Sequence, residues 1–234
     1  MNDAMTERLA LVTGFEPYAG GRINPSCEIA RALDGRRLEG MQIVGRTIPV
    51  GYRGLKAALA ALIEELRPAV AISFGLWPGE SVIRLERIGI NVADFEIADN
   101  EGLLAADERV QDNGAPAHLS TLPLRAIADA LLTQGIPARI SSTAGTFLCN
   151  ACLYTLLDQA AASASGTLCG FVHVPYLPAQ VAEIIGATRD ERRFELHQRA
   201  DLASMDLAMM IKAAEIALSE SIRCAPRMSA AATR

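Results

Sequence analysis

Short apolar segments alternate with helical segments along this chain, and that alternation restricts the fold more than any other feature of the sequence. Runs of apolar and β-branched residues predict strands over 9–14, 42–50, 69–75, 138–141 and 168–174. Helical patterns predict helices over 25–33, 52–66, 122–134, 151–162 and 197–222. Strands separated by helices usually pair in parallel and are covered by helices on both faces. The sequence therefore predicts an α/β protein with a largely parallel sheet.

Local signals place several boundaries within this pattern. Asn24 can cap a helix that has Pro25 in its first turn, and Arg67 with Pro68 ends the next helix. The segment 82–97 alternates in hydropathy and carries β-branched residues. It predicts extended, antiparallel structure within the otherwise parallel arrangement.

Composition and charge narrow the class of protein. With 234 residues, 50% of them hydrophobic, the chain predicts one globular domain over 1–224 and a frayed tail over 225–234. A net charge of −5 argues against nucleic acid or an anionic membrane as a partner. The sequence has neither an apolar run of membrane-spanning length nor a signal peptide pattern. Five cysteines, an odd number, favour reduced thiols in the cytoplasm.

One cysteine stands where a turn becomes a helix. Cys149 follows the turn 142–147 and opens the helical segment. In the first helical turn, unpaired backbone N–H groups and the positive end of the helix dipole favour thiolate over thiol. The same N–H groups can stabilise an oxyanion. Cys149 is therefore a candidate nucleophile with an expected lowered pKa.

A histidine that could serve as its base lies in a buried strand. His173 is the only one of the three histidines in an apolar strand, and Pro175 follows that strand. The alternative is a core histidine bonded to a backbone carbonyl. A cysteine nucleophile needs such a base, and the base needs a third group to orient it. We expect Cys149 and His173 to meet where neighbouring strands end on one side of the sheet.

Two further segments are more polar or more glycine-rich than their surroundings. The loop 14–26 follows the first strand, and its glycines suggest a phosphate cradle but lack P-loop or GxGxxG spacing. Its aromatic residues Phe15 and Tyr18 could instead line a small apolar pocket. Glu86 lies in the extended segment, where it is either a solvent-facing carboxylate paired with Arg84 or Arg87, or a functional group.

Six blocks in this order resemble pyroglutamyl peptidase type I (pyrrolidone-carboxylate peptidase), a cysteine peptidase family, over about residues 9–220. The blocks are TGFEPY (13–18), NPS (24–26), ERIGIN (86–91), DNEG (99–102), AGTFLCN (144–150) and GFVHVPYLPAQ (170–180).

The resemblance implies a fold, an activity and a set of catalytic and substrate-contacting residues. It implies an α/β/α sandwich of three layers around a mostly parallel, mixed, twisted sheet. It also implies no cofactor or metal, cytoplasmic homotetramers, and removal of N-terminal 5-oxoproline from peptides through a thioester. The catalytic residues of the family fall on Glu86, Cys149 and His173, and its lactam-contacting aromatic falls on Phe15, with Tyr18 beside it.

This sequence departs from the family pattern at several positions that bear on specificity. Leu76 stands where the family has glutamine, and Glu96 stands where it has an arginine that assists catalysis. Ala98 replaces a proline, and Tyr18 replaces a phenylalanine. Since loss of a buried hydrogen-bond partner costs on the order of 1–3 kcal/mol, weaker or altered pyroglutamate recognition is expected.

Two other functions fit parts of the sequence. A family paralogue with altered specificity or weak activity would bind or hydrolyse another small cyclic amide, as Leu76 and Glu96 suggest. Cys149 and Cys152 also form a C-x-x-C at a helix start, which is typical of dithiol redox proteins. The aromatic-glycine-proline context of thioredoxins is absent, and a zinc site lacks a second ligand pair.

Overall fold

The structure is a computed structural model that describes residues 8–163, 166–191 and 202–226. Its centre is a seven-stranded sheet in the order β2-β3-β1-β4-β9-β5-β8. The four central strands are parallel to one another: β1 (Leu9–Phe15), β3 (Met41–Ile48), β4 (Val70–Leu76) and β9 (Leu168–Val174).

The edges of the sheet break the parallel pattern. On one side β2 (Arg37–Leu38) runs antiparallel to β3. On the other side β5 (Ile83–Glu86) runs antiparallel to β9, and β8 (Ala138–Ser141) runs parallel to β5. A separate two-stranded ladder joins β6 (Ile88–Ile90) to β7 (Ala117–Leu119). The expected mostly parallel, mixed sheet is confirmed.

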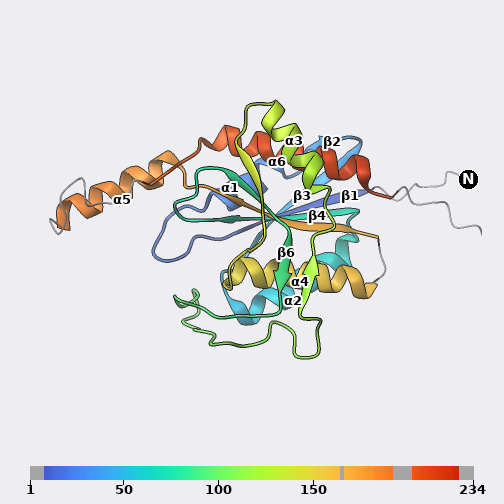
Figure 1. The fold of residues 1–234 in the computed structure, drawn as a ribbon, viewed down its shortest axis with the longest axis horizontal. Helices are drawn as coiled ribbons and strands as arrows, with labels where there is room; N and C mark the ends of the chain where they lie inside the picture. Colours follow the sequence, from blue (N-terminus) through green and yellow to red (C-terminus); the bar gives the residue numbers. More distant parts are fainter. Residues whose placement is uncertain (1–7, 164–165, 192–201, 227–234) are drawn as a thin grey trace, which may run out of the picture.

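Helices cover both faces of the sheet, so the protein has three layers (Figure 1). One face packs against α1 (Pro25–Leu33), α3 (Leu124–Thr133) and α6 (Leu207–Cys224). The other packs against α2 (Tyr52–Leu66) and α4 (Leu148–Ser163). Strand residues alternate between the two cores: Ala10 and Val12 of β1 face one, and Leu11 faces the other. The expected α/β/α sandwich is confirmed.

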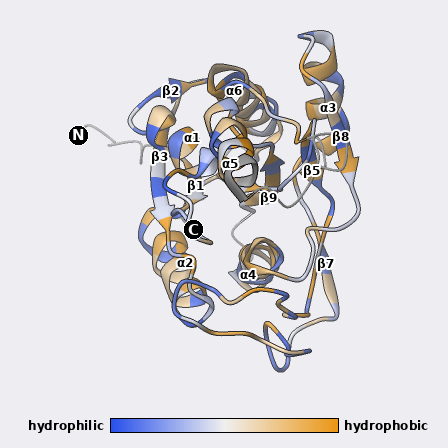
Figure 2. Cartoon of the chain, turned by 90° about the vertical axis from the view of Figure 1, so that its left-hand side faces the viewer, coloured by the Kyte–Doolittle hydropathy of each residue, from blue (hydrophilic) through white to orange (hydrophobic). Residues whose placement is uncertain are grey.

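Helix α4 is buried on nearly all sides over its first three turns. It packs against β9, α2 and the β6–β7 ladder, and it lies among apolar elements in Figure 2. The side-chain amide of Asn150 bonds the backbone of Ile90 and Val92, at 2.8–2.9 Å. These contacts hold the start of α4 against the extended segment that follows β5.

The first helix crosses the first strand at very short range. Asn24 caps α1, its side chain accepting the Ser26 N–H at 3.1 Å, with Pro25 in the first turn as predicted. A Cβ at Gly14 would overlap the Ser26 carbonyl. Glycine at this position therefore allows the start of α1 to lie directly against β1.

Several boundaries differ from the sequence-based predictions. Within the extended segment 82–97, only β5 and β6 are strands. The last helix begins at Leu207, where Asp206 caps it through the Ala208 N–H, and part of its predicted start (197–201) lies outside the described residues. Helix α5 (Pro178–Glu191), which the sequence did not predict, extends away from the body in Figure 1.

The predicted tail lies mostly outside the described residues. Its first residue, Ala225, is buried and packs against the core.

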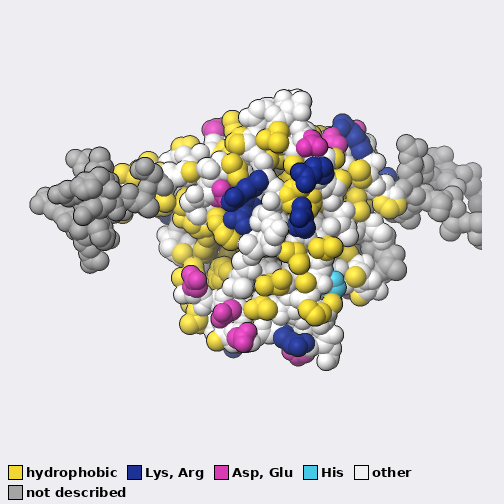
Figure 3. Space-filling view, viewed as in Figure 1, with side chains coloured by type: hydrophobic (Ala, Val, Ile, Leu, Met, Phe, Trp, Pro, Cys, Tyr) yellow, Lys and Arg dark blue, Asp and Glu magenta, His cyan; other side chains and the backbone are white. Residues whose placement is uncertain are grey.

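On the face seen in Figure 3, hydrophobic, basic and acidic side chains lie in small separate groups. Within the described ranges, no helix is long and apolar enough to cross a membrane.

Candidate active site

Cys149 is the second residue of α4, as predicted, and the residue as a whole is half-buried. The preceding turn contains Gly145 at φ +77°, a backbone conformation that favours glycine. The Gly145 N–H donates to Thr143 Oγ1 at 3.0 Å, which tightens the turn. This turn sets the direction in which the chain enters α4 and therefore where the thiol points.

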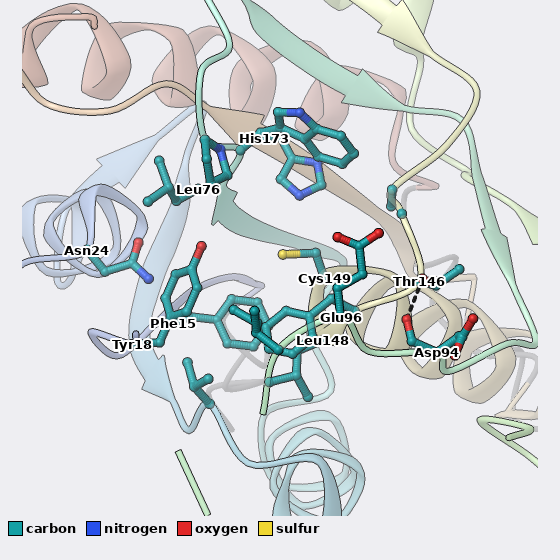
Figure 4. A pocket seen from close by; sticks show the side chains of 17 residues that line it. Phe15, Tyr18, Asn24, Leu76, Asp94, Glu96, Thr146, Leu148, Cys149 and His173 are labelled. Carbon is teal, nitrogen blue, oxygen red and sulfur yellow. Dashed lines mark hydrogen bonds between the residues drawn. The ribbon is translucent and has the colours of Figure 1, made fainter. Parts of the chain in front are cut away.

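Cys149 lies against the sheet at a glycine. A Cβ placed on Gly75 would be 2.9 Å from Cys149 Sγ. Gly75 is the residue opposite His173 in the pairing of β4 with β9. The thiol therefore lies beside the strand position next to His173, and Figure 4 shows the sulfur and the imidazole facing the same space.

His173 and Glu86 form a buried pair. His173 Nδ1 lies 2.8 Å from Glu86 Oε1, and both side chains are almost completely inaccessible. The alternative of a solvent-facing Glu86 is wrong, because β5 lies between β9 and β8. Glu86 does pair with Arg84, at 3.1 Å. Since Nδ1 donates to the carboxylate, Nε2 is the nitrogen left to accept a proton.

The route by which Cys149 reaches His173 differs from the prediction. The strand before Cys149 is β8, which is not a neighbour of β9 and runs in the opposite direction. Cys149 and His173 therefore do not meet at converging strand ends. The chain leaves β8, turns through 142–147 and continues as α4, which lies below the sheet in Figure 1. The thiol near the start of α4 lies against β4 at Gly75.

Burial reverses the expected ionisation of the thiol. It raises the pKa of Cys149, and the nearby Cys152 and Glu86 add to the rise. Burial likewise lowers the pKa of His173, although Glu86 opposes this effect. The helix N-terminus does not overcome the loss of solvation, so the expectation of a lowered thiol pKa is wrong.

A pocket of about 380 Å³ opens in front of this pair. Phe15 and Tyr18 line it as predicted, and Trp77, Leu76 and Phe147 complete its apolar wall. The Tyr18 and Phe147 rings are 6.2 Å apart. Neither Trp77 nor Phe147 was predicted to line the pocket. Two signals were available in the sequence. Trp77 is the only tryptophan and directly follows a central strand, and Phe147 is an aromatic residue two positions before Cys149.

The charged side chains that line the pocket, apart from the titratable His173, are carboxylates. Asp94 and Glu96 contribute to its wall, and among the residues that the structure describes no lysine or arginine does so. In Figure 4 the Glu96 carboxylate points toward the space near Cys149 and His173. Glu96 has no hydrogen bond or ion pair with any residue that the structure describes. The pocket therefore favours a neutral or positively charged group over an anion.

Comparison with known proteins gives the family. The family described as pyroglutamyl peptidase matches residues 8–223. The chain belongs to this family. A pyrrolidone-carboxylate peptidase from Pyrococcus furiosus is 44% identical over 176 residues, which cover 75% of this chain and 85% of that protein. One from Thermococcus litoralis is 37% identical over 212 residues, which cover 91% of this chain and 92% of that protein.

Solved structures of this family share the fold. The crystal structure of pyrrolidone carboxyl peptidase from Pyrococcus furiosus superposes with a TM-score of 0.86 at 38% identity, covering 93% of this chain and all of that one. Within the described part of this pyroglutamyl peptidase family member, no three His, Cys, Asp or Glu side chains cluster in a way that could hold a metal.

Proposed function

We propose that this family member is a pyroglutamyl peptidase I, a cysteine exopeptidase that removes N-terminal 5-oxoproline from peptides. One observation carries the proposal: the Cys149 thiol lies against Gly75, beside His173, and Glu86 holds the far nitrogen of His173 at 2.8 Å. This arrangement of nucleophile, base and orienting carboxylate is the one that acyl transfer requires. The proposed unit is a single domain that needs no cofactor or metal.

The proposed reaction is acyl transfer through a thioester on Cys149. His173 Nε2 takes the thiol proton as Cys149 Sγ attacks the carbonyl carbon between pyroglutamate and the next residue. The resulting imidazolium is stabilised by Glu86 and donates its proton to the leaving amine, which leaves a thioester on Cys149. Water, deprotonated by His173, then hydrolyses the thioester and releases 5-oxoproline and free thiol.

Backbone groups at the start of α4 supply the oxyanion site in this proposal. The first N–H groups of a helix have no partner within the helix. Leu148 and Cys149 are the first two residues of α4, so their N–H groups are the donors in this proposal. One such donor contributes about 3 kcal/mol of barrier lowering in comparable hydrolases.

The test is release of a fluorophore from a pyroglutamyl amide. Cys149→Ala should abolish turnover, whereas Cys152→Ala, one helical turn away, should keep it. Equal turnover by Cys149→Ala and wild type would refute the mechanism. Loss of turnover in Cys152→Ala, with Cys149 still alkylated at the wild-type rate, would favour the dithiol alternative.

The structure weighs against that dithiol alternative. Cys152 is fully buried, its Sγ donates to Ser73 Oγ at 3.4 Å, and burial raises its pKa to about 12. Thiol–disulfide exchange needs an accessible thiolate. Cys152 is better suited to packing than to redox chemistry.

Altered specificity is the second candidate function. Leu76 offers the pocket an apolar side chain that cannot bond a lactam, and Glu96 adds a negative charge. A paralogue that hydrolyses another small cyclic amide would keep Cys149 alkylation but turn over pyroglutamyl amides slowly. Prolyl and other cyclic acyl amides, assayed beside the pyroglutamyl amide, separate the two functions by their relative kcat/KM.

We also propose a cytoplasmic homotetramer, as the family resemblance implies. Helix α5 extends from the body with Ile185 49% exposed, which leaves apolar surface for another subunit to cover. Light scattering after size-exclusion chromatography tests the assembly. A monomer at micromolar concentration would contradict it.

A further inference from the structure

Arg84 is a buried cation directly behind the proposed catalytic residues. It lies on β5 opposite His173, and the residue is only 6% exposed. Arginine is almost never buried to this extent without partners. Every nitrogen of its guanidinium is engaged: Nε donates to Glu86 Oε1 at 3.1 Å, Nη1 to Glu80 Oε2 at 3.4 Å, and Nη2 to both Ser141 and Thr143.

The contacts of Nη2 reach the turn that carries Cys149. Nη2 lies 2.7 Å from Ser141 Oγ and 2.8 Å from the Thr143 carbonyl oxygen. Ser141 Oγ also donates to that carbonyl, at 3.0 Å. Arg84 therefore fixes the chain at the point where it leaves β8 and turns toward α4.

Trp77 links the same guanidinium to the imidazole. The guanidinium carbon stands 3.7 Å from the centroid of the Trp77 ring. That ring meets His173 edge-on, with centroids 4.9 Å apart and planes at 81°. On its other side, a Cβ at Gly145 would lie 3.6 Å from the ring. Trp77 is thus held between Arg84, His173 and the turn before Cys149.

We propose that Arg84 is a positioning residue for the acyl transfer, holding the carboxylate of Glu86, the ring of Trp77 and the turn before Cys149 in one arrangement. Its charge also offsets the carboxylates near His173. The inference rests on the roles proposed above for Glu86, Cys149 and His173.

The charges around His173 determine in which direction the loss of Arg84 should shift the pKa of His173. Glu86 and Arg84 of β5, Glu80 of the β4–β5 connection and Cys149 of α4 face it, while Asp94 and Glu96 line the same pocket. Desolvation lowers the pKa of His173 most; Arg84 lowers it further, whereas Glu86 and Glu80 raise it. Removal of Arg84 should therefore raise the pKa of His173. Because protonated His173 cannot accept the thiol proton, the acidic limb of the pH–rate profile should move to higher pH.

The experiment compares Arg84→Met, Arg84→Lys and a matched control. Arg139→Met is the control, because Arg139 pairs with the same Glu80 but is 58% exposed at its side chain and does not contact Glu86. Alkylation of Cys149 by iodoacetamide is followed across pH by mass spectrometry of the Cys149 peptide, since Cys224 is also exposed. kcat/KM for the pyroglutamyl amide is measured in parallel.

Arg84→Met should move the acidic limb of both profiles up by about one pH unit, and Arg139→Met should superpose on wild type. Arg84→Lys keeps the charge and loses the planar fork, so its limb should stay in place while its plateau rate falls about tenfold. An unmoved limb in Arg84→Met overturns the proposal. If that variant does not fold, an unchanged plateau in Arg84→Lys overturns it.

Alkylation separates this inference from the proposed function. It needs no pyroglutamyl substrate, so a shifted limb without turnover would refute only the peptidase activity. Turnover with unshifted limbs would refute only the role of Arg84.

Discussion

The thiol of Cys149 lies on the bare backbone of Gly75. A Cβ on Gly75 would be 2.9 Å from Cys149 Sγ and 2.7 Å from the ring of Phe171, closer than such atoms normally approach. Gly75 also faces His173 across the β4–β9 pairing. The missing side chain is what allows the nucleophile and its base to lie side by side.

Gly75→Ala should therefore reduce both activity and stability. The methyl group must push Sγ or the Phe171 ring aside, at a cost of about 1–3 kcal/mol in unfolding free energy. Displacement of Sγ from His173 should lower kcat/KM about a hundredfold. Chemical unfolding and fluorogenic turnover measure the two effects.

Gly54→Ala is the matched control for that substitution. Gly54 lies in α2, and a Cβ there would meet nothing within 4 Å. Alanine should stabilise the helix by about 0.5–1 kcal/mol and leave turnover unchanged. Equal activity in the two variants would show that the thiol does not depend on Gly75.

Glu86→Gln should shift the pH profile in the direction opposite to Arg84→Met. The bond and the charge of Glu86 both raise the pKa of His173, so their loss lowers it further. The acidic limb of kcat/KM should move to lower pH, while kcat falls about a hundredfold or more because the imidazolium loses its carboxylate. A limb that moves upward would contradict the assigned contact.

Glu96→Gln should improve the handling of anionic substrates. Glu96 adds an unpaired negative charge to the pocket, so a pyroglutamyl peptide with an acidic second residue should bind better once that charge is removed. We expect its KM to fall about fivefold, and the difference from wild type to shrink at high salt. A peptide with a basic second residue is the control, and its KM should rise.

Buried thiols should make the protein lose stability in alkaline solution. Burial raises the pKa of Cys152 and of Cys169 to about 12. Because the unfolded chain releases these protons at lower pH than the folded one, stability is complete below the unfolded pKa and falls as pH rises above about 9.

The expected loss is about 1.4 kcal/mol per pH unit and per thiol. Urea unfolding under reducing conditions, at neutral pH and at pH about 10, measures it. Cys152→Ala should flatten the alkaline slope, whereas Cys224→Ala should not, since Cys224 is exposed. Identical slopes in wild type and Cys152→Ala would contradict the prediction.

Local sequence patterns were sufficient for many of the elements and for the identity of the main reactive groups. Apolar runs and capping residues predicted α1, α2, β8 and β9 with the observed bounds, because those signals act within a few residues. The same local context placed Cys149 at a helix start and His173 in a buried strand. Family motifs then drew attention to Glu86 and to the aromatic residues of the first loop.

Only the tertiary structure decided how these groups meet and ionise. Insertion of the antiparallel β5 between β9 and β8 buries Glu86 beside His173, and strand order depends on packing between distant segments. Burial outweighs the helix dipole at Cys149, because desolvation depends on every neighbour rather than on the helix alone. Arg84 and Trp77 joined the site for the same reason: their contacts span segments that the sequence keeps apart.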